Sequence, residues 1–101
     1  MFNLNKKDEA YVIFNNALEL NPAIKEIHLN LGYIALTDKE FSKANNSLKK
    51  AIALDPNYVL AYENMVLLAE KQNNITDMKF YLNKILEIEP DHKAKQILHN
   101  L

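Results

Sequence analysis

The sequence of 101 residues contains no cysteine and no arginine, and each absence excludes a class of function. Without cysteine there are no disulfides, thiolate metal sites or cysteine nucleophiles. All 12 basic residues are lysines, so the planar guanidinium fork that reads guanine and phosphate is missing. With 13 acidic residues the formal net charge is only -1, and we therefore expect no nucleic-acid partner.

Glycine and long apolar runs are also scarce. Gly32 is the only glycine, which excludes the glycine signatures of nucleotide-binding loops and of serine hydrolases. No apolar run approaches the roughly 20 residues that a membrane span needs, so we expect no membrane span. The start of the chain lacks a secretory signal pattern, and we expect a cytoplasmic protein, although a parent chain could carry a targeting signal upstream. Few turn residues and abundant Leu, Lys, Glu, Ala and Ile favour helices.

The three prolines mark an internal repeat. Pro22, Pro56 and Pro90 are 34 residues apart, and no other proline occurs. Shifting the sequence by the same step aligns apolar with apolar and small with small residues. The aligned sets include Ala10, Ala44 and Met78; Phe14, Leu48 and Leu82; Ala17, Ala51 and Ile85; His28 and Tyr62; Asn30 and Asn64; and Ala35 and Ala69. A structural unit therefore repeats along the chain.

Each unit has the apolar spacing of two helices. The i, i+3, i+4, i+7 pattern of a helix runs from Ile27 to Ala35 and again from Ala44 to Ile52. Each proline should end the second helix, because proline cannot occupy a helix interior. The polar stretches 37–40 and 72–74 should join the two helices of a pair, which then pack antiparallel. We expect Asn57, Asn74 and Asp91 to cap the helices that follow them.

This pattern resembles the tetratricopeptide repeat family, a helix-turn-helix unit of about 34 residues with small residues at the helix crossing and a closing proline. The motif residues of the best-formed unit are Leu31, Gly32, Ala44, Ala51 and Pro56, with Ala10, Phe14, Ala17 and Pro22 before it and Tyr62, Ala69, Leu82 and Pro90 after it. The resemblance implies an all-α fold, an α-solenoid of antiparallel helix pairs in a right-handed superhelix. In the third unit Val66, Met78 and Ile85 replace the family's small residues, so we expect a wider helix pair there.

We assign one domain to residues 1–101. Residues 1–22 form a partial repeat, mainly its second helix, and the chain begins partway into that unit. Residues 23–56 and 57–90 form two repeats, and residues 91–101 form a C-terminal capping helix with a polar outer face.

The sequence offers no convincing catalytic, cofactor or metal site. His92 and His99 are seven residues apart, about 10 Å along one helix, which is too far to share a metal ion. His28 aligns with Tyr62, which favours a packed ring over a metal ligand. We expect neighbouring carboxylates such as Asp8 and Glu9 to lie on solvent-exposed helix faces, without a cleft that could separate their pKa values. We predict no catalytic residues, no cofactor and no metal.

The most informative surface is the one that stacked repeats create. In the family that this chain resembles, the first helices of successive units line the concave side of the solenoid. Leu29, Tyr33, Leu36, Leu60 and Leu67 project outward there and should form an exposed apolar strip, a common mark of a binding site. The predicted partner-binding residues are Glu26, Leu29, Asn30, Tyr33, Leu36, Leu60, Glu63, Asn64, Leu67 and Glu70.

The resemblance also implies how a partner is held. In the family, asparagines at the positions of Asn30 and Asn64 often bind the backbone of an extended ligand. The family's carboxylate clamp needs lysine and arginine beside such an asparagine. This chain has Leu29, Tyr33, Leu60, Ala94 and Leu98 at those positions, so we expect no clamp. The acidic rim instead favours a partner segment that is apolar and has basic residues.

Three functions remain open from sequence alone. The first hypothesis is a non-enzymatic protein-interaction module that binds a partner segment in the concave groove. The second is self-association, with the helix at Lys7–Leu20 burying its face, including Ile13 and Ala17, against another copy as a homo-oligomer. The third is a docking or regulatory part of a larger enzyme.

Overall fold

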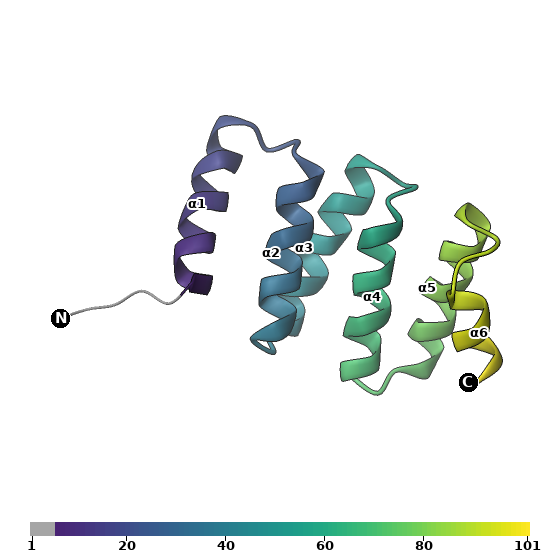
Figure 1. The fold of residues 1–101 in the computed structure, drawn as a ribbon. Helices are drawn as coiled ribbons and strands as arrows, with labels where there is room; N and C mark the ends of the chain where they lie inside the picture. The colour runs from purple at the N-terminus through teal and green to yellow at the C-terminus, as the bar shows by residue number, and fades with distance from the viewer. Residues whose placement is uncertain (1–5) are drawn as a thin grey trace.

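The structure, a computed structural model, describes residues 6–101, and this part of the chain is built of α-helices alone (Figure 1). The helices are α1 (Lys6–Leu20), α2 (Lys25–Thr37), α3 (Phe41–Leu54), α4 (Val59–Lys71), α5 (Ile75–Ile88) and α6 (Ala94–His99). The prediction of an all-α fold is thereby confirmed. Residues 1–5, which belong to the expected partial repeat, lie outside the described residues. The expectation that the chain begins partway into a repeat concerns these same residues.

The two helices of each complete pair are joined by the same turn. α2 packs against α3, and α4 packs against α5, as antiparallel neighbours (Figure 1). The chain reverses at Lys39 and Asn73, which have left-handed φ angles of 62° and 56°. A backbone hydrogen bond of 2.8 Å spans each turn, from the N–H of Glu40 to the carbonyl of Ala35 and from the N–H of Asn74 to that of Ala69. These bonds satisfy carbonyl groups that the ending helix leaves free.

One of the three predicted helix caps is confirmed. The side-chain Oδ1 of Asn74 accepts a hydrogen bond of 3.0 Å from the backbone N–H of Asp77, in the first turn of α5. The amide of Asn74 also donates to the carboxylate of Asp77 at 2.9 Å. These two hydrogen bonds together fix the start of α5.

The other two cap predictions, Asn57 and Asp91, are wrong. The residue that precedes α4 is Tyr58 and the one that precedes α6 is Lys93, and neither side chain caps its helix. The backbone N–H of Asn57 donates to Oδ1 of Asp55 at 3.1 Å, within the turn that precedes α4. This side chain-to-backbone turn around the proline delays the start of α4 beyond Asn57.

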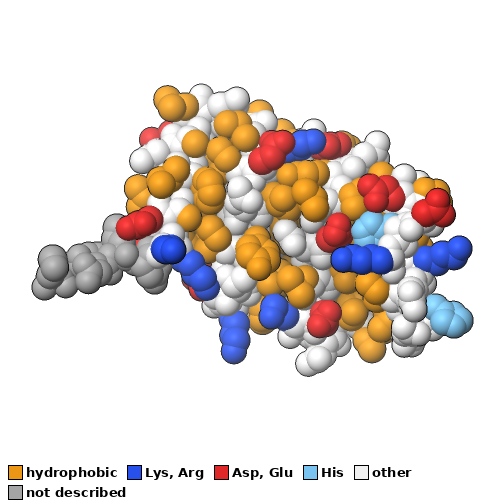
Figure 2. Space-filling view, viewed as in Figure 1, with side chains coloured by type: hydrophobic (Ala, Val, Ile, Leu, Met, Phe, Trp, Pro, Cys, Tyr) orange, Lys and Arg blue, Asp and Glu red, His pale blue; other side chains and the backbone are white. Residues whose placement is uncertain are grey.

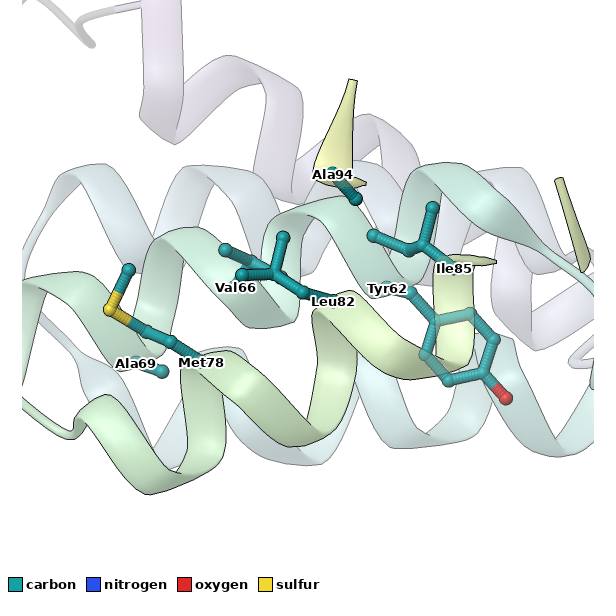
Figure 3. Packing of buried hydrophobic residues seen from close by; sticks show 7 residues of the cluster. All are labelled: Tyr62, Val66, Ala69, Met78, Leu82, Ile85 and Ala94. Carbon is teal, nitrogen blue, oxygen red and sulfur yellow. The ribbon is translucent and has the colours of Figure 1, made fainter. Parts of the chain in front are cut away.

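The closest helix crossing is made possible by Gly32. A Cβ atom at this position would lie 2.7 Å from Cγ of Leu48, which is fully buried on α3. In the next repeat the equivalent positions hold Val66 and Leu82, which pack side by side in Figure 3. Because valine needs more room than glycine, α4 and α5 contact each other less extensively than α2 and α3 do.

The core consists of two clusters that α4 connects. One cluster joins α2, α3 and α4, and its buried residues are Ala35, Leu36, Ala44, Leu48, Met65 and Leu68. The other joins α4, α5 and α6 through Tyr62, Val66, Ala69, Met78, Leu82, Ile85 and Ala94 (Figure 3). Every repeat is therefore stabilised by its neighbour as well as by its own helix pair.

His28 and Tyr62, at equivalent positions one repeat apart, each contact the carbonyl oxygen of a proline. Nε2 of His28 lies 2.8 Å from the carbonyl oxygen of Pro22, and the hydroxyl of Tyr62 donates to the carbonyl of Pro56 at the same distance. A carbonyl can only accept, so Nε2 carries the imidazole proton. The prediction that His28 is a packed ring is confirmed, since it is buried. Both side chains tie the proline turn to the helix that follows.

An ion pair ties the start of α2 to the end of α3. Nζ of Lys25 lies 2.5 Å from the carboxylate of Asp55 and 4.5 Å from the ring centre of Tyr58. The hydrogen bond from Lys25, followed by that from the N–H of Asn57, lowers the pKa of Asp55, and the bond to Asp55 raises the pKa of Lys25. Both side chains remain about one-third exposed, so solvent weakens the pair.

The two outer helices are held less firmly than the central four. α1 has no buried residue, and its outer side exposes Val12, Ile13 and Leu20. It contacts α2 and is linked to the turn after α2 by an ion pair of 2.6 Å between Lys7 and Asp38. α6 begins at Ala94, so it is shorter than the expected helix over 91–101.

Candidate functional site

α2 and α4 together present the surface on which the sequence predicts a partner. The two helices lie next to each other and in front of α3 and α5 in Figure 1. We call their shared outward surface the groove face. Figure 2 shows hydrophobic side chains gathered in the middle of this face, with acidic side chains near its upper edge and toward α6.

The apolar strip is only partly exposed. Tyr33 on α2 is 50% exposed and Leu60 on α4 is 55% exposed, which are high values for large apolar side chains. Leu29 and Leu67 are half-buried, because they pack against the edge of the cluster that joins α2, α3 and α4. Tyr33 and Leu60 are therefore the apolar contacts that the groove face offers most openly.

The predicted exposure of Leu36 is wrong. Its side chain is 0% exposed and packs in the same cluster as Met65 and Leu68 of α4. Projecting α2 on its own placed Leu36 outward, but α4 covers the C-terminal end of α2 in the folded chain. Leu36 is thus a core residue between repeats and is removed from the set of candidate contact residues.

Asn30 and Asn64 occupy equivalent positions on the groove face. Asn30 is exposed and Asn64 is half-buried. Neither side-chain amide forms a hydrogen bond with any residue between 6 and 101. An amide has two donor hydrogens and one acceptor oxygen, which together match the carbonyl and N–H groups of an extended backbone. The structure leaves both amides available for such contacts.

The three predicted acidic residues of the groove face differ in exposure and in their neighbours. Glu26 lies in the first turn of α2 and is exposed, as is Glu70 near the end of α4. Glu63 is half-buried, and its Oε1 lies 3.5 Å from Nε2 of His92, just before α6. Of these three carboxylates, only Glu63 lies within 4 Å of a basic side chain among the described residues, the imidazole of His92.

His92 and its neighbours are the part of this surface that sequence reasoning missed. His92, Lys93 and Ile97 line a hollow beside Glu63, Leu67 and Glu70. The available signal was the repeat register, which aligns His92 with Tyr58 immediately before a first helix. That register predicts where α6 begins but not which of its side chains turn toward α4, because this depends on how α6 packs.

Among residues 6–101, no group of three or more histidine and carboxylate side chains is gathered closely enough to hold a metal ion. In the same part of the chain, every helix is too short or too polar to traverse a lipid bilayer. Apolar contacts, amides and carboxylates are what the groove face offers a partner.

Comparison with known proteins agrees with this geometry. A sequence model of the tetratricopeptide repeat matches residues 25–58 and 59–92, which contain the helix pairs α2–α3 and α4–α5. Each match begins at the first helix of a pair and includes the proline turn that follows the second.

Three curated proteins illustrate the range of similar chains. Trophozoite exported protein 1 of Plasmodium falciparum is 32% identical over 99 residues, covering 93% of this chain and 9% of that protein. Anaphase-promoting complex subunit CDC16 of Saccharomyces cerevisiae is 41% identical over 54 residues, covering 54% and 6%. Protein O-mannosyl-transferase Tmtc3 of Drosophila melanogaster is 28% identical over 81 residues, covering 80% and 9%. The match thus spans less than a tenth of each of these relatives.

Proposed function

Because the chain belongs to the tetratricopeptide repeat family, which generally provides non-enzymatic protein-interaction modules, we propose that it binds an extended partner segment along the groove face. The observation that carries this proposal is the combination of Tyr33 and Leu60, both about half-exposed, with the amides of Asn30 and Asn64, which have no partner in residues 6–101. Apolar side chains supply affinity, and the paired amides supply direction along the backbone.

The chemistry of the surface also defines the partner. Apolar side chains of the partner pack on Tyr33 and Leu60 and on the edges of Leu29 and Leu67. Glu26 and Glu70 stand at the rim without ion-pair partners among the described residues, so basic residues of the partner complement them and acidic ones are repelled. A partner of this kind is an apolar peptide segment with lysine or arginine nearby. A nucleic acid does not fit, since its phosphates would face carboxylates.

The test uses a peptide selected on the 101-residue chain from a random library displayed on phage. Tyr33→Ala and Asn64→Ala should each weaken its binding, measured by isothermal titration calorimetry, by more than about 1 kcal/mol, as central contacts do. Neither change should lower the melting temperature appreciably, because Tyr33 is half-exposed and the amide of Asn64 forms no hydrogen bond with residues 6–101.

Matched controls are Lys49→Ala and Lys50→Ala, which change exposed residues on α3, behind the groove face. They should leave the affinity unchanged. An affinity that responds to Lys49 or Lys50 but ignores Tyr33 and Asn64 places the binding site elsewhere and overturns the proposal.

A second proposal, self-association, is favoured by the outer side of α1. Ile13 is 65% exposed and Leu20 is 90% exposed, and no residue between 6 and 101 covers them. Ala17, in contrast, is half-buried, so Ile13 is the better probe. If α1 packs against a second copy, light scattering detects a dimer that Ile13→Glu converts to a monomer. A monomer at all accessible concentrations contradicts this proposal.

The third hypothesis, docking within a larger enzyme, has weaker support. One relative is named as a transferase, but the match covers only 9% of that protein. The match does not extend the transferase activity to this chain, and we propose no reaction for it.

A further inference from the structure

A hollow of about 180 Å³ opens on the groove face where α4 meets α5 and α6. Its floor is apolar and consists of Val66, Leu82 and Ile85, which belong to the core cluster in Figure 3. Leu67 from α4 and Ile97 from α6 form its walls. Leu67 also belongs to the apolar strip, so the hollow continues the groove face toward the C-terminal end of the repeat array.

The rim of this hollow carries two carboxylates. Glu63 and Glu70 are separated by two turns of α4, about 10 Å, and Leu67 lies between them. Glu70 is exposed and has no ion-pair partner among the described residues, whereas Glu63 faces His92. Lys93 also borders the hollow, but it forms no ion pair within residues 6–101.

The ring of His92 does not neutralise Glu63 in this geometry. Its Nδ1 accepts a hydrogen bond of 2.9 Å from the backbone N–H of Ala94 and therefore carries no proton. The single ring proton lies on Nε2, 3.5 Å from the carboxylate of Glu63, so the imidazole is neutral in this arrangement. With two carboxylates and one lysine at its rim, the hollow has a negative balance of charge.

We propose that the hollow receives a lysine or arginine side chain of the partner segment. The aliphatic stem packs on Leu67, Val66 and Ile97, and the cationic head lies at the rim between Glu70 and Glu63. A purely apolar side chain would desolvate the two carboxylates without pairing them, and an acidic one would be repelled. This inference rests on the proposed function, because the partner must already lie along the groove face.

Continuity with the rest of the groove face supports the same occupant. Asn64 directly follows Glu63 on α4, so a backbone held by Asn64 passes beside the hollow. A long side chain extending from that backbone reaches the hollow, and its charge remains at the solvent edge.

The experiment repeats the phage selection on the whole chain with a library that is random at every position. Selected peptides should carry lysine or arginine at a constant distance from their apolar residues. On Glu70→Lys the same selection should lose this basic residue, or replace it with aspartate or glutamate, and keep the apolar ones. Glu70 is exposed, so its replacement leaves the fold intact, which the melting temperature checks.

The matched comparison is Glu70→Gln against Glu19→Gln. Both remove one exposed carboxylate, but Glu19 lies on α1, outside the groove face and the hollow. For a selected peptide, Glu70→Gln should weaken binding by about fivefold to tenfold, because glutamine keeps a neutral hydrogen bond about half as strong as the charged one. Glu19→Gln should change it less than about twofold, because an exposed charge far from the partner contributes little to binding.

The outcomes separate this inference from the proposed function. Peptides that share only apolar residues, and bind equally to wild type and Glu70→Gln, overturn the basic-residue assignment while the groove remains the binding site. Peptides that bind regardless of Tyr33→Ala and Asn64→Ala overturn the groove itself. A selection that enriches no peptide counts against the groove and therefore against both proposals.

Discussion

At the scale of single residues, the helix crossing at Gly32 shows how the two repeats accommodate different side chains at equivalent positions. The 34-residue register pairs Gly32 and Leu48 with Val66 and Leu82. Leucine is unchanged on the second helix, so the difference between the repeats lies in the side chain that faces it. In the first repeat the helices pack around a missing Cβ, and in the second, where valine takes its place, the two helices contact each other less extensively.

We predict that Gly32→Ala destabilises the fold. The new Cβ would lie 2.7 Å from Cγ and 2.8 Å from Cδ2 of Leu48, which is confined in the core. Overpacking of this kind costs roughly 1–3 kcal/mol, and alanine regains about 1 kcal/mol of helix propensity. The net loss is therefore up to about 2 kcal/mol, which urea unfolding measures. Asn30→Ala, an exposed change on the same helix, is the control, and a more stable Gly32→Ala protein would show that the crossing is looser than we conclude.

A second residue-scale prediction concerns the left-handed turn at Lys39. A side chain at a φ angle of 62° is unfavourable, and glycine relieves that strain without losing the hydrogen bonds of the turn. Lys39→Gly should therefore stabilise the fold by roughly 0.5–1 kcal/mol, read from the urea midpoint. Gln72→Gly provides the contrast, because Gln72 has a φ angle of -92° and gains nothing from glycine. Equal effects of the two changes would contradict this explanation.

At the scale of helices, periodicity predicted most of what the structure contains. The apolar spacing and the three prolines located the helix pairs, because both are local consequences of helix geometry and of the missing proline N–H. The wrong predictions concern residues whose environment depends on contacts between elements. Leu36 is covered by α4, and Asn57 lies in the turn with Asp55 instead of capping α4. The hollow lined by His92 and Ile97 exists only because α6 packs against α5 while the segment before α6 lies beside α4, an arrangement that periodicity does not encode.

The ion pair between Lys25 and Asp55 gives a prediction about acid stability. The pKa of Asp55 is lowered from its ordinary value of 3.8, so its contribution to stability is fully present above that value. It is lost as the pH falls through the lower pKa of the folded state. Wild type should therefore melt at a higher temperature than Asp55→Asn at neutral pH, and the two should converge in acid below the ordinary carboxylate pKa.

Salt provides the control for this pair. Both side chains are about one-third exposed, so added salt at neutral pH should narrow the difference in melting temperature as well. A difference that persists unchanged in strong acid would show that the effect of Asp55 does not depend on its charge.

At the scale of the whole molecule, stability depends on which neighbours each helix has. α4 lies between the two core clusters and contacts α2, α3 and α5. Among the described helices α1 contacts only α2, and it buries no residue. In a stacked repeat array, stability is the sum of each repeat and its interfaces, so the array loosens from its ends. The groove face lies on α2 and α4, the best-supported first helices, which keeps its side chains in fixed positions for a partner.

We predict that hydrogen exchange follows this order. Amides of α1 should exchange fastest among the longer helices and those of α4 slowest, as mass spectrometry of peptic fragments measures. Leu48→Ala removes a fully buried side chain from the cluster that joins α2, α3 and α4 and should speed exchange in all three helices. Ile13→Glu, on the exposed side of α1, should leave α4 unchanged. Equal protection of α1 and α4 would mean that the chain unfolds as one unit, because only a fully cooperative array hides the difference between its centre and its end.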